Sequence, residues 1–343
     1  MAERAHVRLT DVAAAARVSA STASRALREH PAVSPRTRRR VKAAAAALGY
    51  EPNRMASALR SRVSPFVGIV VPDITFPFFA HAVKAAQEVL ERAGYQVLVM
   101  NTDRDAAQER RALRTLLAHR AGGVLLATSG GADTDERLPL VFFANFPPAS
   151  THARVALSNR EGTRMLVEHL IAHGHERIAY IGGTPDATSG SERLAGFCET
   201  LEAAGLAAGM AVRISDDAWS PASAARAAAE LLDATPRPSA IVAGGDRLAL
   251  GAIQAIKARG LRIPEDVALA SFQDPDPLGG VLEPAVTSLS GQERALGHHA
   301  AGLLVQALAD PERSLAALEV RLPAELVVRR SCGCSVAANV ATD

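Results

Sequence analysis

In the N-terminal part of the chain, one segment has residue types and spacing suited to molecular recognition. This segment is ASTASRAL, residues 20–27. A helix over this segment would expose small and basic side chains on one side: Ala20, Ser21, Ser24 and Arg25. Arginine can donate to both acceptors of a guanine, serine bonds to several bases, and an alanine methyl touches only apolar groups such as a thymine methyl. The segment therefore predicts a helix that reads DNA bases, with Arg25 as the main reader.

Short helices are expected to position these side chains. Thr10 is the predicted cap of a first helix that runs to about Arg17. Ser19 is the predicted cap of a second helix from Ala20 to about Leu27. Two helices separated by so few residues have the spacing of a helix-turn-helix, in which the N-terminal end of the second helix enters the major groove.

A third helix is expected to complete this unit. Ser34 caps it, Pro35 occupies its first position, and Gly49 ends it. The predicted core of the unit comprises Val12, Val18, Ala23, Leu27, Val41, Ala44, Ala45 and Leu48. The predicted outer surface of the third helix is basic and carries Arg36, Arg38, Arg39, Arg40 and Lys42.

The charge of the 343-residue chain is divided unevenly. Residues 1–63 contain 13 Lys and Arg against 4 Asp and Glu, a net charge of +9, so the other 280 residues carry −7. An alanine-rich helical hairpin whose arginines only keep it soluble is the alternative interpretation of the first segment. The asymmetry favours a surface that binds DNA phosphates instead. Double-stranded DNA is therefore an expected partner.

Beyond residue 64 the sequence alternates between short apolar runs and amphipathic stretches. The predicted strands cover residues 66–71, 96–100, 123–127, 138–144, 177–181, 211–214, 240–243 and 267–271. The predicted helices cover residues 80–93, 106–119, 162–173, 191–204, 221–232, 246–259 and 292–309, and residues 318–330 should form a terminal strand pair. This alternation predicts an α/β body of two doubly wound parallel-sheet lobes, with a ligand cleft at the C-terminal ends of the strands.

Three aromatic residues follow the first predicted strand of the body. Phe76, Phe78 and Phe79 lie within four positions, in a chain that has nine Phe, three Tyr and one Trp. Loops after strands line the predicted cleft, so these rings could stack on a ligand. The alternative is that they belong to the core of the lobe.

The runs TDVAAAARVSASTASRAL, VSPRTRRRV and LGYEPNRMASALRS resemble the lactose/galactose repressor (LacI/GalR) family of bacterial transcription regulators, and the likeness extends over essentially the whole chain. The resemblance implies a periplasmic-binding-protein-like body whose chain crosses three times between the lobes. It also implies a homodimeric or tetrameric repressor with a pseudo-palindromic operator, controlled by a small-molecule effector, with a sugar as the leading candidate. The corresponding domains are 1–50, 51–63 and 64–343, with the N-terminal lobe at about 64–145 plus part of 275–343 and the C-terminal lobe at about 155–272.

Residues 51–63 are too few for a stable isolated helix, which needs about 12 to 15 residues even in favourable sequences. The resemblance implies a hinge helix that forms when two copies meet on DNA and insert a leucine into the minor groove, a device that kinks DNA. Leu59 occupies that position and Ala56 the helix contact beside it. Thr10, Asn53 and Arg54 complete the expected DNA-contacting set. A flexible linker with an incidental leucine is the alternative.

The resemblance also places effector contacts in the cleft. Arg193, in SGSERLAGF, matches an arginine that holds an effector oxygen, and Ser189 matches a second contact. Trp219, the only Trp, matches a position where an aromatic ring stacks on a sugar. Asp246 and Gln273 complete the set. A salt bridge across the cleft is the alternative role of Arg193.

The chain departs from the family pattern at three positions in or beside this set. Ala144 stands where an acidic residue is common, Gly245 where an asparagine often precedes Asp246, and Gln273 where an aspartate is expected. Several polar effector contacts are thus missing or weakened. The identity of the effector and the direction of its effect therefore stay open.

Other classes of protein fit the sequence less well. It contains no P-loop, no G-x-G-x-x-G, no H-E-x-x-H and no G-x-S-x-G, so an enzyme is disfavoured and no cofactor is expected. A transport-type sugar-binding protein has the same two-lobed body but needs a signal peptide and no basic head. An architectural DNA binder that ignores ligands is a third possibility. The N-terminus MAERAHVR lacks an apolar core and no run reaches roughly 20 apolar residues, so a cytoplasmic protein without a membrane partner is expected.

Two short motifs contain side chains that can bind metals: Cys332-Gly333-Cys334 and His173-Gly174-His175-Glu176. A lone C-x-C without a second pair is a weak signal, and three cysteines do not make a disulfide framework. The His-Gly pair is typical of a helix end. We therefore expect an inert C-terminus, a structural junction and no metal site.

Overall fold

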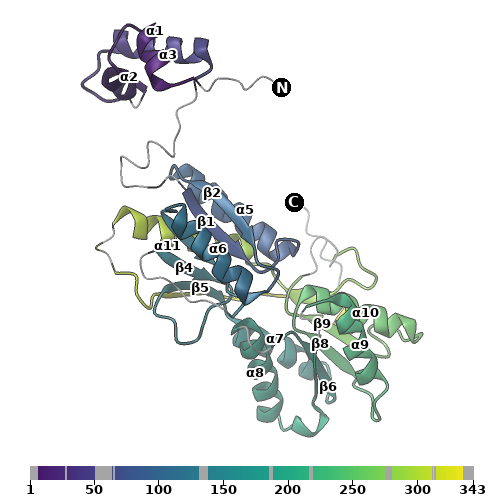
Figure 1. The fold of residues 1–343 in the computed structure, drawn as a ribbon. Coiled ribbons are helices and arrows are strands. Elements are labelled where there is room, and N and C mark those ends of the chain that lie inside the picture. The colour runs from purple at the N-terminus through teal and green to yellow at the C-terminus, as the bar shows by residue number, and fades with distance from the viewer. Residues whose placement is uncertain are drawn as a thin grey trace. The chain divides into compact units, whose positions relative to one another are not determined.

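A computed structural model describes residues 7–27, 29–50, 64, 66–130, 138–184, 188–215, 219–274, 280–310, 312 and 314–334. The chain divides into two compact units, Met1–Pro65 and Phe66–Asp343, which we call the head and the body (Figure 1). The hinge predicted over residues 51–63, with Asn53, Arg54, Ala56 and Leu59, lies outside the described residues.

The head contains the three predicted helices: α1 (Leu9–Ala15), α2 (Ala20–Leu27) and α3 (Pro35–Leu48). The predicted caps of α2 and α3 are confirmed. The Ser19 hydroxyl accepts the backbone N–H of Thr22 at 3.1 Å, and the Ser34 hydroxyl accepts that of Thr37 at 3.2 Å. Gly49 ends α3 in the left-handed conformation with φ of 65°, which glycine adopts without strain.

The predicted cap of α1 is wrong. The helix begins at Leu9, so Thr10 is already inside its first turn and is exposed. The backbone N–H of Arg8 donates to the Asp11 carboxylate at 2.8 Å. An ionised carboxylate is a stronger acceptor than a hydroxyl, so Asp11 fixes the start of the helix two residues earlier, with Arg8 at the cap position. The helix also ends at Ala15, before Arg17, whose φ of 51° is left-handed.

The core of the head is built around Val12 and Val41, both fully buried. Leu48 was expected in this core but is 39% exposed. At 14 residues α3 is longer than α1 and α2, with seven and eight, so its last turn extends past its partners. Val33 and Tyr50, from the segments that flank α3, contribute to the core instead.

Arg38 also departs from the prediction, because it is half-buried instead of lying on the outer surface. Its guanidinium donates to the backbone carbonyls of Glu29 and His30, both at 3.2 Å. The side chain therefore holds the loop between α2 and α3. Nearby, Lys42 pairs with Glu29 at the surface, at 2.5 Å.

The body contains two six-stranded sheets, ordered β11-β5-β4-β3-β1-β2 and β12-β10-β9-β8-β6-β7. The strands of the first sheet are β1 (Phe66–Val71), β2 (Gln96–Asn101), β3 (Gly123–Leu126), β4 (Leu140–Phe143), β5 (Ala153–Leu157) and β11 (Glu319–Leu322). Those of the second are β6 (Ile178–Gly182), β7 (Ala211–Ile214), β8 (Ala240–Ala243), β9 (Ala268–Ser271), β10 (Thr287–Leu289) and β12 (Leu326–Val327). All neighbouring strands are parallel except β10 and β12.

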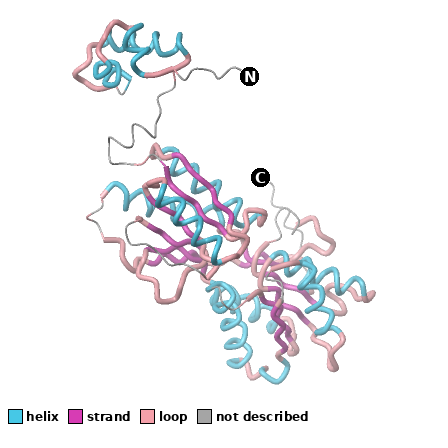
Figure 2. The backbone as a smooth tube through the Cα atoms, viewed as in Figure 1, coloured by secondary structure: helices cyan, strands magenta, loops and turns pink. Residues whose placement is uncertain are grey.

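Helices cover both faces of each sheet (Figure 2). The N-terminal lobe consists of the first sheet with α5 (Pro77–Arg92), α6 (Ala106–Ala118) and α11 (Glu293–Ala309). The C-terminal lobe consists of the second sheet with α7 (Asn159–Ala172), α8 (Thr188–Ala203), α9 (Pro221–Leu232) and α10 (Asp246–Ala258). Side chains of α5 and α11 share a core on one face of the first sheet, and those of α6 pack on the other face. In the second lobe, side chains of α9 and α10 share a core on one face of the sheet, and those of α7 and α8 share a core on the other face.

The chain passes between the lobes three times: after Leu157, between Leu289 and Glu293, and between Leu322 and Leu326. The expected terminal strand pair is wrong, because β11 lies beside β5 and β12 lies beside β10. The connecting residues Pro323, Ala324 and Glu325 contain no turn-forming Gly or Asn, so the chain continues into the other lobe instead of folding back.

Two strands of the body were not predicted. β5 reads ARVAL and extends the N-terminal lobe to Leu157, past the predicted start of the C-terminal lobe at about 155. β10 has only three residues and joins the sheet of the C-terminal lobe. Both are too short and too mixed for a periodic pattern to emerge. Across the described residues, no helix combines the length and the apolar character needed to cross a membrane.

Replacing Arg38 by alanine should destabilise the loop between α2 and α3 by about 1–3 kcal/mol, because backbone carbonyls lose a charged donor. Hydrogen exchange of the amides of residues 29–33 in the full chain should then be faster. Arg40→Ala is the matched control, since Arg40 is an exposed residue of the same helix. Equal exchange in the two variants would contradict the role of Arg38.

Candidate DNA-reading surface and interlobe cleft

The predicted base-reading residues share the outward side of α2. Ala20, Ser21 and Arg25 are exposed and Ser24 is half-buried, whereas the intervening Ala23 and Ala26 face the core. Only four residues separate α1 from α2, as a helix-turn-helix requires. The exposed basic residues of the head include Arg8, Arg17, Arg36, Arg39 and Arg40. The head therefore carries the predicted base-reading side chains together with exposed cations that suit phosphates.

The body contains a cleft between its lobes, with about 530 Å³ of unfilled space including its mouth. The enclosed volume is only about 60 Å³, smaller than the roughly 300–1,000 Å³ of small-molecule sites, so a ligand requires movement of the lobes or of the lining side chains. The sequence-predicted residues in its lining are Phe76, Phe78, Phe79, Ser189, Arg193, Trp219 and Gln273. These side chains come from both lobes, so a bound molecule would contact both.

Arg193 is the central polar residue of the cleft and is buried, with 4% exposure. It donates to the Asn159 side chain at 2.9 Å and to the carbonyl of Gly244 at 2.6 Å. Its guanidinium also stacks over the ring of Phe272 at 3.7 Å. Burial lowers the pKa of Arg193 to about 10, so the group still carries its charge at neutral pH.

The expected alternative, an ion pair of Arg193 across the cleft, is not found among the described residues. Its partners there are neutral oxygens and aromatic faces. Asp246 and Glu192 favour its charge only from beyond ion-pair distance. A buried cation without a contact ion pair is costly, so the site favours a ligand that brings electron-rich oxygens.

Trp219 lies beside Arg193, and the distance from the Arg193 Cζ to the centroid of the indole ring is 5.6 Å. Its φ of 72° is left-handed, an uncommon conformation for a bulky residue. Two glycines make room for the indole: a Cβ at Gly183 would lie 2.3 Å from it, and one at Gly245 would lie 2.9 Å from it. The glycine at position 245, a departure from the family pattern, thus accommodates the tryptophan.

The three phenylalanines play two roles. Helix α5 begins at Pro77 instead of the predicted Ala80, so Phe78 and Phe79 lie in its first turn. Their rings pack edge to face in the core of the lobe, with centroids 5.1 Å apart. Both residues also line the cleft. Phe76 instead has the Arg247 guanidinium 3.7 Å from its ring centroid.

Arg247 connects the lobes at the mouth of the cleft. It extends from α10 in the C-terminal lobe and donates to the carbonyl and the hydroxyl of Thr75, at 3.0 and 3.1 Å. A second link between the lobes is the ion pair of Arg321 in β11 with Glu192 in α8, at 2.8 Å. Both contacts are polar and half-exposed, so they can break and reform in water.

Asp246 was predicted to contact the effector, but it is not among the residues that line the cleft. It is buried at the start of α10, where its carboxylate accepts the backbone N–H of Arg247 at 2.8 Å. Burial raises the pKa of this carboxyl. Its carboxylate thus binds the first turn of the helix that carries Arg247, and its charge also favours the protonated form of Arg193 and so raises the pKa of that residue.

Sequence reasoning missed several residues of the lining, among them Arg104, Asn145 and Asn159. Asn145 accepts the backbone N–H of Ser189 at 3.2 Å, across the lobes. Asn159 donates to Glu192 at 2.9 Å while it accepts from Arg193. Asn159 lies just after β5, at the strand end that faces the cleft. A prediction of that strand would therefore have pointed to Asn159.

A wider hollow lies elsewhere, between the outer surfaces of α7 and α8. Its charged residues already pair with one another: Arg164 binds Glu168 at 2.7 Å, and Arg160 binds Glu199 at 3.3 Å. Exposed ion pairs of this kind characterise a solvated crease between helices. The smaller interlobe cleft, with its buried guanidinium, is the better candidate for a ligand site.

A helix-turn-helix head joined to a two-lobed body with a ligand cleft defines the class of DNA-binding regulators that carry their own receptor. Residues 8–53 match the profile of bacterial regulatory proteins of the lacI family, and residues 167–332 match that of a periplasmic binding protein-like domain. The ribose operon repressor of Halalkalibacterium halodurans is 31% identical over 326 residues, covering 94% of this chain and 96% of that protein.

Solved structures give the same result. The lac repressor dimer bound to operator and the anti-inducer ONPF matches with a TM-score of 0.86 and 28% identity, over 96% of this chain and 99% of that chain. A complex of the transcriptional regulator CelR with cellobiose matches with a TM-score of 0.69 and 31% identity, over 95% and 99%. The chain belongs to the lacI family, whose members are DNA-binding regulators rather than enzymes, and it is a transcriptional regulator.

Replacing Gly183 by alanine should displace the Trp219 indole and cost about 1–3 kcal/mol, because the added methyl has no space. Thermal unfolding and the fluorescence of Trp219 in the ligand-free protein would measure both effects. Gly302→Ala in α11 is the matched control, since a Cβ there would meet nothing within 4 Å. Unchanged emission and stability in Gly183→Ala would refute the tight fit.

Proposed function

We propose that the protein is a repressor that binds a two-fold symmetric operator as a homodimer, and that a sugar in the interlobe cleft controls this binding. The observation that carries the proposal is the pairing of buried Arg193 with Trp219 in a cleft lined by both lobes. A sugar offers vicinal hydroxyls to a planar cation and an apolar ring face to an indole. The cellobiose bound by CelR supports this ligand class.

On DNA, α2 enters the major groove and places its exposed residues against the base edges. Arg25 takes a guanine, and Ala20, Ser21 and Ser24 make the permissive contacts. Thr10, exposed in α1, contacts the backbone. The hinge residues Asn53, Arg54, Ala56 and Leu59 complete the interface by ordering over the minor groove, with Leu59 as the wedge.

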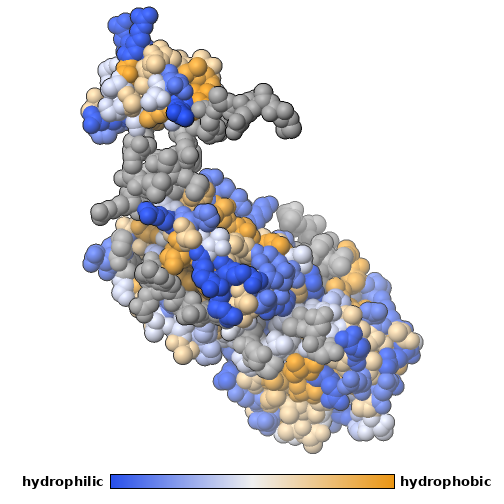
Figure 3. Space-filling model, in the orientation of Figure 1, coloured by the Kyte–Doolittle hydropathy of each residue, from blue (hydrophilic) through white to orange (hydrophobic). Residues whose placement is uncertain are grey.

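The homodimer is supported by an apolar edge on the N-terminal lobe. Leu98 and Val99 in the edge strand β2 are 42% and 44% exposed, which is unusual for large aliphatic side chains in one strand. Figure 3 shows hydrophobic residues gathered near β2 and α5, beside a hydrophilic patch over α6. Burying this edge against a second copy would remove the apolar surface from water and give the dimer symmetry that a palindromic operator requires.

Ligand control follows from the contacts that join the lobes. A sugar bound to Arg193 and Phe76 would change how Arg247 and Thr75 meet, because Phe76 lines the cleft and its ring contacts the Arg247 guanidinium. Lobe closure of this kind is a two-state motion that can bias a distant element. We propose that the biased element is the hinge of residues 51–63.

The direct test selects bound duplexes from a random DNA pool with the full chain, and then screens the recovered site for release by sugars. Two inverted half-sites are expected. No preference for any duplex over random competitor at moderate ionic strength, with or without sugars, would overturn the proposal.

Arg25→Ala should relax the preference at one base pair of each half-site by about 1–3 kcal/mol. Binding to the selected site and to single-base variants would measure the change. Arg39→Ala is the control: an exposed arginine outside α2 should weaken all sequences alike and lower the salt dependence. A uniform loss for Arg25→Ala would show that it contacts phosphate only.

The single tryptophan provides a readout of cleft occupancy. Titrating the full chain with cellobiose, ribose and related sugars should change the Trp219 emission for the effector class and for no unrelated sugar. Arg193→Ala should abolish the response yet leave operator affinity without sugar unchanged, since the head does not contain this residue. A sugar response that persists in Arg193→Ala would remove this residue from the proposed site.

A further inference from the structure

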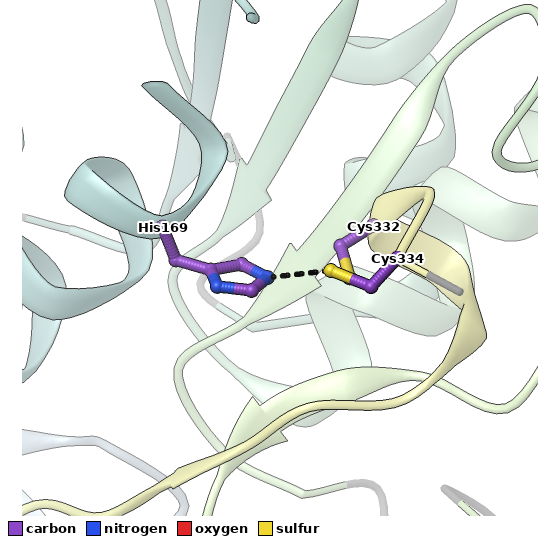
Figure 4. A group of neighbouring side chains, drawn as sticks. All are labelled: His169, Cys332 and Cys334. Atoms are coloured by element: carbon purple, nitrogen blue, oxygen red, sulfur yellow. Dashed lines mark hydrogen bonds between the residues drawn. The ribbon is translucent and has the colours of Figure 1, made fainter. Parts of the chain in front are cut away.

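Two motifs that lie far apart in the sequence meet in the C-terminal lobe. His169 in the last turn of α7 and His173 at its C-cap are four residues apart, and their ring centroids are 4.5 Å apart. The C-terminal segment brings Cys332 and Cys334 beside them, and Figure 4 shows His169 pointing toward the two sulfurs. The Cys334 Sγ lies 3.3 Å from His169 Nε2, 2.9 Å from His173 Nε2 and 3.0 Å from the Cys332 Sγ.

The local backbone explains why both cysteines face the same helix. A short 3-10 helix, Arg330–Cys332, ends at Gly333, whose φ of 87° lies in the left-handed region. This turn directs the chain back so that Cys334 approaches Cys332, and any side chain at position 333 would be strained.

The imidazole of His173 is already arranged for coordination. Its Nδ1–H donates a hydrogen bond to the backbone carbonyl of His169, at 2.7 Å. The Nε2 atom, which faces Cys334, then carries the lone pair. A ligating histidine in metalloproteins is usually held in this way by a backbone carbonyl or carboxylate at its other nitrogen. The Thr287 hydroxyl, 3.1 Å from the Cys332 Sγ, similarly orients that sulfur.

We propose that His169, His173, Cys332 and Cys334 bind one Zn²⁺ ion with tetrahedral geometry. Two sulfurs and two imidazole nitrogens form a set that zinc prefers, and the histidines have the H-x₃-H spacing of such sites. His169, Cys332 and Cys334 place their ligand atoms within 4.8 Å of one another, and His173 joins them through its contact with Cys334. None of these four residues is a carboxylate, which disfavours Mg²⁺ and Ca²⁺.

The three distances from the Cys334 Sγ to the other ligand atoms fit an ion with modest movement. Zn–S bonds of about 2.3 Å and Zn–N bonds of about 2.0–2.1 Å place two sulfurs about 3.8 Å apart and a sulfur about 3.5 Å from a nitrogen. The present separations of 3.0 Å and 2.9–3.3 Å are shorter, so the ligands must open by less than about 1 Å. His173 is exposed and gives the ion a path to the site, whereas Cys332 is fully buried.

The test incubates the reduced full-length chain with Zn²⁺ alone, removes excess metal by gel filtration and measures the metal content. One equivalent is expected. Substitution by Co²⁺ should give the thiolate-to-metal absorption and the visible bands of a tetrahedral site. Binding of no metal, or a mass two hydrogens lower than that of the reduced chain from a Cys332–Cys334 disulfide formed in preference to uptake, would overturn the proposal.

Variants locate the ion. Cys334→Ser and His173→Gln should each weaken Zn²⁺ binding by at least about 100-fold, since loss even of an outer partner costs about 10–100-fold. Cys198→Ser and His119→Gln are matched controls, because these residues lie in α8 and at the C-cap of α6, outside the group. Circular dichroism of the variants checks folding. Equal zinc binding in the ligand variants and the controls would assign the ion elsewhere and refute the site.

Discussion

The body depends on one constraint: parallel neighbouring strands all end at the same edge of their sheet. Each return to that edge requires a covering helix, so the loops that follow the strands converge. Phe76 follows β1, Asn145 follows β4, Trp219 follows β7 and Gln273 follows β9, and all four line the cleft. Residues from two lobes thus share one small space. The cleft is therefore a consequence of topology, and its chemistry is set by the few side chains placed there.

Arg193 shows how that chemistry is set. Asn159, the Gly244 carbonyl and the Phe272 ring hold the guanidinium in place without neutralising it. A carboxylate partner would stabilise the cation but would also compete with any ligand for its donors. Neutral partners leave the charge available to oxygens that arrive with a ligand. Arg193 therefore stabilises the body less than a paired arginine would, but its charge can attract a ligand's oxygens.

Local patterns predicted the elements well where they were long and periodic, and failed where a tertiary contact decided the outcome. The bounds of α2, α3 and α9 follow from their caps and prolines, and those of β1 and β7 from apolar runs. Thr10 lost its capping role to Asp11, and β5 was missed because its five residues, ARVAL, are too few and too mixed for a periodic pattern. The cleft residues were found chiefly through the family resemblance, yet Asn159 could not be found without β5. Asp246 has the expected position but faces the helix backbone instead of the cleft.

The third crossing between the lobes brings the C-terminal segment of the chain to α7. Its first residue, Asn159, holds Arg193 in the cleft, while its last turn and C-cap carry the histidines that meet the C-terminal cysteines. A 14-residue helix spans about 20 Å and transmits a shift along its axis with little bending. The C-terminal segment, which reaches α7 only because β11 and β12 lie in different lobes, therefore anchors the far end of the element that positions the receptor's cation. In the proposed lobe closure, this contact at one end of α7 and the Asn159–Arg193 hydrogen bond at the other would couple the tail to the cleft.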